Sequence, residues 1–124
     1  MPSLIHVLED DEDIREIIGC ILTDAGYLTQ LSACVREFNK LIKVTLPDLI
    51  LMDVRLPDGN GKELCHRIKQ NTATANIPVI LISASANRHM LLEESLADDF
   101  ISKPFDIYFL IDTITSKLPG SKKQ

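Results

Sequence analysis

The sequence predicts a single α/β domain, a doubly wound parallel sheet of five strands in the order 2-1-3-4-5 with helices on both faces. Short apolar runs alternate with segments of helical period, which is the pattern of parallel strands joined by crossover helices. The chain has 124 residues, 45% of them hydrophobic, so it can build one core and has no room for a second folded unit.

Two strands and two helices are expected in the first part of the chain. The apolar run Ile5 to Leu8 predicts strand one, and Tyr27 to Leu31 predicts strand two. Between them lies the clearest helix, which Gly26 ends. Its apolar stripe has helical spacing and comprises Ile14, Ile17, Ile18, Ile21, Leu22 and Ala25. The second helix is predicted from Val35, Phe38, Leu41 and Ile42.

The alternation continues through the second part of the chain. The remaining strands are expected at residues 48–52, 79–82 and 100–101. The run 79–82 is apolar throughout, which suits a strand covered on both faces. The remaining helices are expected to begin at Gly61, to lie near residues 89–96, and to place Ile107, Leu110, Ile111, Ile114 and Leu118 on one side before Pro119-Gly120.

Charge, hydropathy and cysteine usage exclude several classes of protein. The 18 acidic and 13 basic residues give a net charge of -5 without a basic stripe, which disfavours nucleic-acid binding. No apolar run approaches the roughly 20 residues that span a bilayer, so no membrane contact is expected. Cys20, Cys34 and Cys65 lack metal-ligand spacing and fall within expected helices, and they are interpreted as reduced core residues of a soluble, cytoplasmic protein.

Acidic side chains follow two strands that the predicted order places side by side. Glu9, Asp10 and Asp11 follow strand one, and Asp53 closes the apolar run of strand three. Any helix N-terminus favours such a run of acids. However, carboxylates within ~4 Å repel by roughly 4 kcal/mol per pair at an effective dielectric near 20. Their joint placement therefore indicates a cation, and Mg²⁺ suits a site with few protein ligands and an open side.

A lysine and a serine follow two further strands. Lys103 precedes Pro104, which biases the lysine toward an extended backbone and permits a cis peptide bond, so the ammonium group can be held over the crevice. Ser83 follows strand four, where its hydroxyl can bond its own backbone or donate to an incoming oxyanion. Acids and a lysine at strand ends predict a cation and phosphoryl site.

With these residues the chain resembles the receiver domains of two-component response regulators. The motifs that carry the resemblance are Glu9-Asp10, Asp53, Leu56-Pro57 with Gly61, Ser83-Ala84, Ala97-Asp98-Asp99-Phe100 and Lys103-Pro104-Phe105. The resemblance covers about Leu4 to Leu118 of a single domain at residues 1–124, and it leaves 119–124 as a tail or linker stub. It implies the flavodoxin-like sheet predicted above.

The resemblance implies a role for each matching residue. Asp53 would accept a phosphoryl group from the phosphohistidine of a sensor histidine kinase or phosphotransfer protein. The ligands of Mg²⁺ or Mn²⁺ would be Asp10, Asp53, the backbone carbonyl of Arg55 and, through water, Glu9. The phosphoryl oxygens would contact Ser83, the backbone of Ala84, and Lys103, which a cis bond joins to Pro104. The switch residues would be Ser83 and Phe100, and Asp11 is left as a helix cap.

The implied activity is signalling rather than turnover of an external substrate. The domain would take part in its own phosphotransfer and dephosphorylation. It would switch the surface of the fourth helix, fifth strand and fifth helix for a downstream protein or a fused output domain. Three positions depart from the family's common pattern: Leu96 stands where glycine is frequent, Phe100 lacks the hydroxyl of the frequent tyrosine, and His6 stands at a strand position that is usually apolar.

Other functions fit the residues less well. Haloacid-dehalogenase-type phosphatases carry Asp-x-Asp at the nucleophile, whereas Arg55 stands two residues after Asp53. The acids at residues 9–13 would repel a flavin phosphate. An EF-hand loop beginning at Asp53 would place Arg55 and Pro57 at ligand positions. A degenerate receiver that only docks a partner stays open, as does the choice between a stand-alone receiver and the N-terminal part of a longer regulator.

Overall fold

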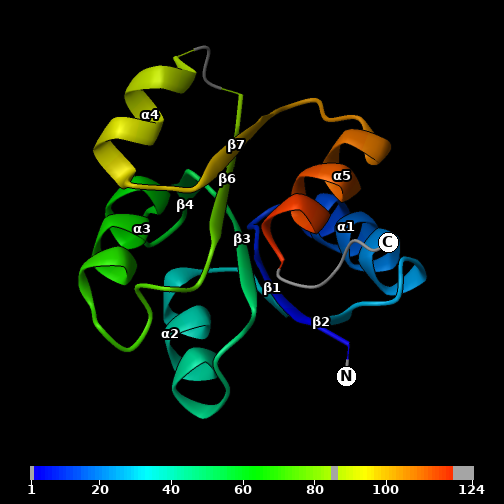
Figure 1. The fold of residues 1–124 in the computed structure, drawn as a ribbon, viewed down its shortest axis with the longest axis horizontal. Helices are drawn as coiled ribbons and strands as arrows, with labels where there is room; N and C mark the ends of the chain where they lie inside the picture. Colours follow the sequence, from blue (N-terminus) through cyan, green and yellow to red (C-terminus); the bar gives the residue numbers. More distant parts are fainter. Residues whose placement is uncertain (1, 85–86, 119–124) are drawn as a thin grey trace.

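The computed structural model, which describes residues 2–84 and 87–118, places one parallel sheet between two layers of helices (Figure 1). The strands of this sheet are β1 (Leu4–Leu8), β2 (Leu28–Ser32), β3 (Leu49–Asp53), β6 (Val79–Ser83) and β7 (Asp99–Ser102). The helices are α1 (Glu12–Asp24), α2 (Val35–Val44), α3 (Gly61–Gln70), α4 (Arg88–Ser95) and α5 (Ile107–Lys117). The expected stop at Pro119-Gly120 and the tail at 119–124 lie outside the described residues.

The strand order confirms the predicted fold class. The sheet runs β2-β1-β3-β6-β7, and all neighbouring strands in it are parallel. Counted within the sheet alone, this order is the predicted 2-1-3-4-5. The winding reverses between β1 and β3, where Leu8 and Met52 are register partners. Glu9 and Asp53 therefore reach the same edge of the sheet, at the crevice where open α/β sheets bind ligands.

The two faces of the sheet carry separate apolar clusters. Helices α1 and α5 pack on one face, and α2, α3 and α4 pack on the other (Figure 1). Strands β3 and β6 are buried along their whole length, as the unbroken apolar run of the fourth expected strand predicts. No helix within the described ranges is both long and apolar enough to cross a bilayer.

A short hairpin follows β3 and is absent from the sequence prediction. Strand β4 (Arg55–Leu56) pairs antiparallel with β5 (Gly59–Asn60), and two-residue strands are too short for an alternating pattern to indicate them. The hairpin carries Asp58 to the start of α2, where its carboxylate accepts the N–H groups of Val35 at 2.8 Å and Arg36 at 3.0 Å. The hydrogen bond from Val35 is the main reason that the pKa of Asp58 lies below its ordinary value.

Two helices bury narrower faces than the sequence predicts. In α1 the buried residues include Ile18 and Leu22, whereas Ile17 is 52% exposed. Ile17 lies at the edge of the apolar stripe farthest from Leu22, and the sheet does not reach it. In α5, Leu110 and Ile114 are buried, but Ile107 in the first turn is 49% exposed. A hydrophobic stripe thus sets the orientation of a helix but not the width of its contact.

Of the three cysteines predicted to be core residues within helices, one is buried in a helix. Cys65 is buried in α3, and burial raises the pKa of its thiol to about 12. Cys20 is exposed, because it lies on the side of α1 away from the buried stripe. Cys34 is partly buried and precedes α2 as its N-cap instead of lying within the helix. The expectation of three core cysteines in helices is therefore wrong for Cys20 and Cys34.

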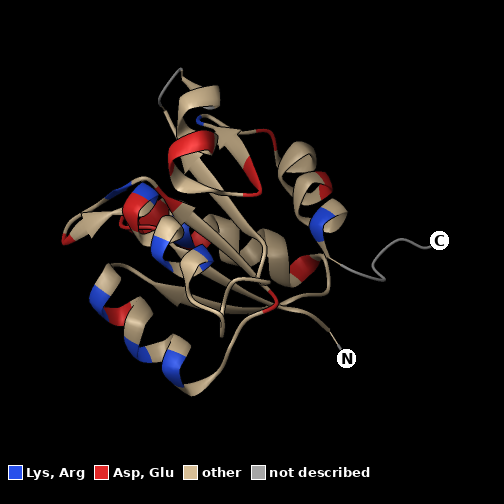
Figure 2. Cartoon of the chain, turned by 60° about the vertical axis from the view of Figure 1, so that its left-hand side comes forward, with Lys and Arg blue, Asp and Glu red and all other residues tan. Residues whose placement is uncertain are grey.

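Helix α2 carries a short basic face that the charge analysis overlooks. Arg36, Lys40 and Lys43 recur at helical spacing and are all exposed. Figure 2 shows blue bands and a red band along this helix. Three cations on one helix of a chain with net charge -5 remain far from the basic footprint of a nucleic-acid-binding domain.

Helix α4 ends in a strained backbone conformation. Leu96 has φ 64° and ψ 20°, the left-handed region in which a residue with a Cβ costs roughly 1–2 kcal/mol, and its N–H donates to the carbonyl of Leu92 at 3.0 Å. The side chain is 44% exposed, so it contributes little burial in return. Glycine, which has no Cβ, would adopt this conformation without a steric penalty.

We therefore expect Leu96→Gly to stabilise the protein by about 1 kcal/mol, because it removes the left-handed strain at the end of α4. Urea unfolding followed by circular dichroism measures the change. Leu96→Ala is the matched control, since it removes the same exposed side chain but keeps the Cβ. Equal stabilities of the glycine and alanine variants would contradict this explanation.

Candidate cation and phosphoryl site

Three carboxylates meet where β1 and β3 end. One carboxylate oxygen from each of Glu9, Asp10 and Asp53 lies within 4.8 Å of the other two. Glu9 and Asp53 are buried, and Asp10 is exposed. The side-by-side placement of the two strands thus brings these acids together, and the cluster has one open side.

Lys103 lies against two of the three carboxylates. Its Nζ donates to Oδ2 of Asp53 at 2.8 Å and lies 3.0 Å from Oε1 of Glu9. Its own N–H donates to the carbonyl of Ser83 at 2.9 Å, and its bond to Pro104 is cis, the isomer anticipated from the sequence. Burial opposes the charge of Lys103, but the hydrogen bonds and attraction from Asp53 and Glu9 together raise its pKa.

Glu9 is the most deeply buried member of the cluster. Its Oε2 accepts the N–H of Asp11 at 3.1 Å, whereas Oε1 has the ion pair with Lys103 but no hydrogen bond among the described residues. Burial outweighs both contacts and raises the pKa of Glu9 to about 7. A buried carboxylate oxygen short of partners, beside two further carboxylates, fits a hard divalent cation.

The loop after Asp53 begins α3 directly against the site. Oδ1 of Asp53 accepts the N–H of Arg55 at 3.2 Å, and the N–H of Gly61 donates to the carbonyl of Val54 at 2.7 Å. A Cβ at Gly61 would lie 2.2 Å from the backbone oxygen of Asp53, so only glycine allows this close approach. Asn60 caps the helix by accepting the N–H groups of Lys62 and Glu63.

A cleft of about 630 Å³ opens above the carboxylates. Its lining includes Asp10, Asp53, Arg55, Ser83, Ala84 and Lys103, so the structure gathers these predicted site residues, with Glu9 buried among the acids. Phe100 does not line the cleft. It is 2% exposed and packs in the apolar cluster beneath α2, α3 and α4.

Four lining residues are absent from the predicted site: Val54 and Asn60 in the loop after β3, and two residues within helices. Lys62 is the second residue of α3, and Leu91 belongs to α4. The sequence predicts only that residue 62 belongs to the helix that begins at Gly61. No local signal marks either residue, because only the packing of α3 and α4 against the sheet edge brings them to the cleft.

Asp11 occupies the predicted capping position. Its side chain accepts the N–H of Ile14 at 3.1 Å at the start of α1. It is therefore used as an N-cap, which satisfies one of the free amides of the helix. His66 and His89 are exposed on α3 and α4. No described histidine or cysteine joins the acidic cluster.

Comparison with known proteins assigns the chain to a family. The model of the response regulator receiver domain matches residues 5–115, so the chain belongs to that family. Receiver domains are phosphoacceptor domains of two-component systems and are phosphorylated by histidine kinases. The phosphate regulon transcriptional regulatory protein PhoB of Pseudomonas aeruginosa is 36% identical over 103 residues, which are 82% of this chain and 45% of that protein.

Solved structures have the same fold. The signal receiver domain of a histidine kinase from Syntrophus aciditrophicus superposes with a TM-score of 0.86 at 33% identity, over 98% of this chain and 94% of that chain. The receiver domain of a sensor histidine kinase from Pseudomonas aeruginosa superposes with a TM-score of 0.83 at 24% identity, over 94% and 97% of the two chains. That structure holds a magnesium ion in its active-site cleft. The present chain spans about half the length of the curated relatives it matches.

The raised pKa of Glu9 predicts how stability depends on pH without a metal. A carboxyl group whose pKa is raised on folding stabilises the protein fully below its unfolded value, here 4.5, and loses that contribution as the pH rises through about 7. Glu9→Gln removes this loss. The variant should therefore gain stability relative to the wild type between pH 5 and pH 8, by roughly 1–3 kcal/mol at about 1.4 kcal/mol per pKa unit.

Urea unfolding in EDTA at several pH values measures this difference. Glu16→Gln, at an exposed position of α1, controls for the loss of one carboxylate. A stability difference between Glu9→Gln and the wild type that stays constant from pH 5 to pH 8 would show that burial of Glu9 imposes no such cost.

Proposed function

We propose that Asp53 of this domain accepts a phosphoryl group from a phosphohistidine on a sensor histidine kinase or phosphotransfer protein. One arrangement carries the proposal: Oδ2 of Asp53 lies 2.8 Å from the ammonium group of Lys103, and two further carboxylates share its end of an open cleft. A partly buried carboxylate beside a cation and an entrance for a donor is what acyl phosphate formation requires.

The transfer needs stabilisation of charge more than covalent help from the protein. A carboxylate oxygen of Asp53 forms the new bond to phosphorus while the bond from phosphorus to the imidazole nitrogen breaks, and that nitrogen keeps the electron pair. Lys103 would face the spreading negative charge of the equatorial oxygens. The hydroxyl of Ser83 and the backbone N–H of Ala84, both at the cleft, would donate to the same oxygens.

The acidic cluster would hold Mg²⁺, or Mn²⁺ in its place. We assign Asp10 and Asp53 as direct ligands, the carbonyl of Arg55 as a third, and Glu9 as a ligand through water. When bound, the cation neutralises charge on the transferring group. A water on the bound cation would also give Oε1 of Glu9, which is paired with Lys103, the hydrogen bond that it lacks among the described residues. Hydrolysis of the acyl phosphate in the same cleft would end the signal.

The degenerate-receiver alternative lacks a specific observation in its favour, because the acids and Lys103 retain direct contacts. We further propose that this domain contacts proteins and not nucleic acid. The supporting observation is the net charge of -5, with only a short basic face on α2. The recipient of the signal would be a downstream protein or a fused output domain.

Ser83 and Phe100 would transmit the effect of phosphorylation from the site to the protein surface. A phosphoryl group adds a charge of roughly -1.5 to -2 and would draw the hydroxyl of Ser83 toward it. Phe100 is already buried, opposite Leu81 in the sheet register and in one cluster with Leu91 of α4. The response that we propose is a repacking of Phe100 and Leu91 that shifts the surface of α4, β7 and α5 between two arrangements.

The phosphoacceptor assignment predicts that Asp53→Asn abolishes labelling, because an amide is not a nucleophile for phosphorus. EDTA should also abolish labelling of the wild type. Incubation with radiolabelled phosphoramidate followed by electrophoresis measures the incorporated phosphate. Asp112→Asn, at an exposed position of α5, is the control and should label normally. Normal labelling of Asp53→Asn, or of the wild type in EDTA, would refute the assignment.

The switch assignment predicts that Phe100→Leu labels at close to the wild-type rate but transmits a weaker change to α4 and α5. Leucine keeps the position apolar, so a large loss of stability is avoided. Amide chemical shifts of α4 and α5 before and after phosphorylation report the response. Phe109→Leu, at a half-exposed position of α5, serves as the control. Shift changes of undiminished size in Phe100→Leu would remove this residue from the switch.

A further inference from the structure

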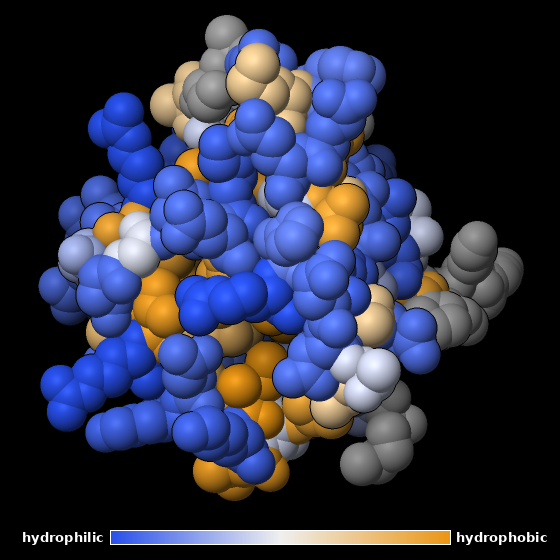
Figure 3. Space-filling model, turned by 90° about the vertical axis from the view of Figure 1, so that its left-hand side faces the viewer, coloured by the Kyte–Doolittle hydropathy of each residue, from blue (hydrophilic) through white to orange (hydrophobic). Residues whose placement is uncertain are grey.

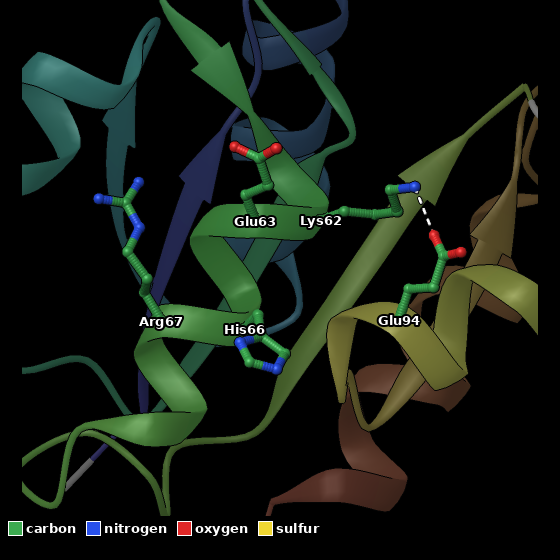
Figure 4. A pocket seen from close by; sticks show the side chains of 5 residues that line it. All are labelled: Lys62, Glu63, His66, Arg67 and Glu94. Atoms are coloured by element: carbon green, nitrogen blue, oxygen red, sulfur yellow. Dashed lines mark hydrogen bonds and ion pairs between the residues drawn. The ribbon is translucent and has the colours of Figure 1, made fainter.

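Lys62 lines two neighbouring hollows of the molecule. One is the cleft above Asp53, and the other is a pocket of about 430 Å³ between α3 and α4. The second pocket is lined by Lys62, Glu63, His66, Arg67 and Glu94 (Figure 4). Figure 4 shows the side chain of Lys62 running from the start of α3 toward Glu94, whereas Arg67 points away from α4.

The start of α3 fixes the base of this lysine beside the phosphoryl site. Gly61 packs so closely on β3 that a Cβ there would overlap the backbone oxygen of Asp53. Lys62 is the next residue, and its N–H donates to the capping side chain of Asn60 at 2.7 Å. The backbone of Lys62 is therefore constrained, whereas its long side chain can rotate from one contact to another.

The present partner of Lys62 is a carboxylate on α4. Nζ lies 2.5 Å from Oε1 of Glu94, and the two side chains are 31% and 48% exposed. Ion pairs this exposed contribute little stability, so the lysine can exchange partners at small cost. Glu94 lies three residues after Leu91, so one face of α4 presents Leu91 to the Asp53 cleft and Glu94 to Lys62.

Charge balance at the site favours such an exchange after phosphorylation. The charges of the three carboxylates would be balanced by Lys103 together with the proposed divalent cation. Phosphorylation replaces the single charge of Asp53 with a group of roughly -1.5 to -2, which leaves an excess of up to about one negative charge. Among the lysines that line the cleft, Lys62 is the one not already paired with Asp53 and Glu9.

We propose that Lys62 is a second phosphoryl-binding lysine. Its ammonium group is paired with Glu94 before phosphorylation and moves to the phosphoryl oxygens when Asp53 is phosphorylated. This inference rests on the proposed function. The exchange removes one contact between α3 and α4, and it provides a route from the phosphoryl group to α4 that does not pass through Phe100. Figure 3 shows the face that carries these helices as mostly hydrophilic, with apolar areas between the polar side chains.

Two substitutions that break the same ion pair test the proposal. Lys62→Gln removes the ammonium group of this lysine. In the presence of Mg²⁺ it should weaken the binding of beryllofluoride, a mimic of the phosphoryl group, about threefold. Glu94→Gln frees Lys62 for the cleft and should strengthen binding by a similar factor. The double variant should match Lys62→Gln, because Glu94 acts only through Lys62. Titration followed by ¹⁹F NMR measures the affinities, and Lys40→Gln on α2 is the control.

The outcomes separate this inference from the proposed function. If the ion pair only ties α3 to α4, the two single variants will change the affinity in the same direction, and the role of Lys62 is refuted. Equal affinity of Lys62→Gln and the wild type refutes it as well. If the wild type binds no beryllofluoride, or Asp53→Asn binds it equally well, the phosphoacceptor function itself fails. Urea unfolding of each variant verifies that the compared proteins are folded.

Discussion

The mutual repulsion of three carboxylates at one end of the sheet is the constraint on which the site depends. The sheet reverses its winding between β1 and β3, and this brings Glu9, Asp10 and Asp53 close together. Their proximity is therefore a consequence of the strand order. Lys103 offsets part of the repulsion through its contacts with Asp53 and Glu9. The cluster costs stability in the metal-free protein and, by the same electrostatics, attracts a cation and an activated phosphoryl group.

The surroundings of the site consist of elements that close backbone contacts hold in place. Gly61 lets α3 begin against the carbonyl of Asp53, and the N–H of Lys103 is bound to the end of β6 through Ser83. Asp58, at the tip of the hairpin, caps α2 from outside that helix. The backbone positions of the reacting residues are therefore fixed. Phosphoryl transfer requires this, because it depends on accurate positioning of the groups.

Helix α4 is the element best suited to respond to the site. It presents Leu91 to the cleft and Glu94 to Lys62, and it ends at the strained Leu96. The left-handed conformation of Leu96 departs from what would make the helix most stable. Such departures are expected where a fold must support two arrangements, because a segment optimised for one of them could not change. An apolar path through Phe100 and a charged path through Lys62 would both converge on this helix.

The sequence by itself determined the parallel strands and the carboxylates at their ends, because apolar runs, helical periods and the positions of acids after strands are local patterns. The order 2-1-3-4-5 was predicted as the common arrangement of five such strands, and the structure has it. The sequence also determined the cap at Asp11. Only the tertiary structure decided that Ile17 and Cys20 are exposed, since a stripe gives the direction of burial but not its extent. The tertiary structure also decided the capping by Asp58 and the position of Lys62 between two hollows. These depend on contacts between segments far apart in the chain, for which a single sequence has no periodic signal.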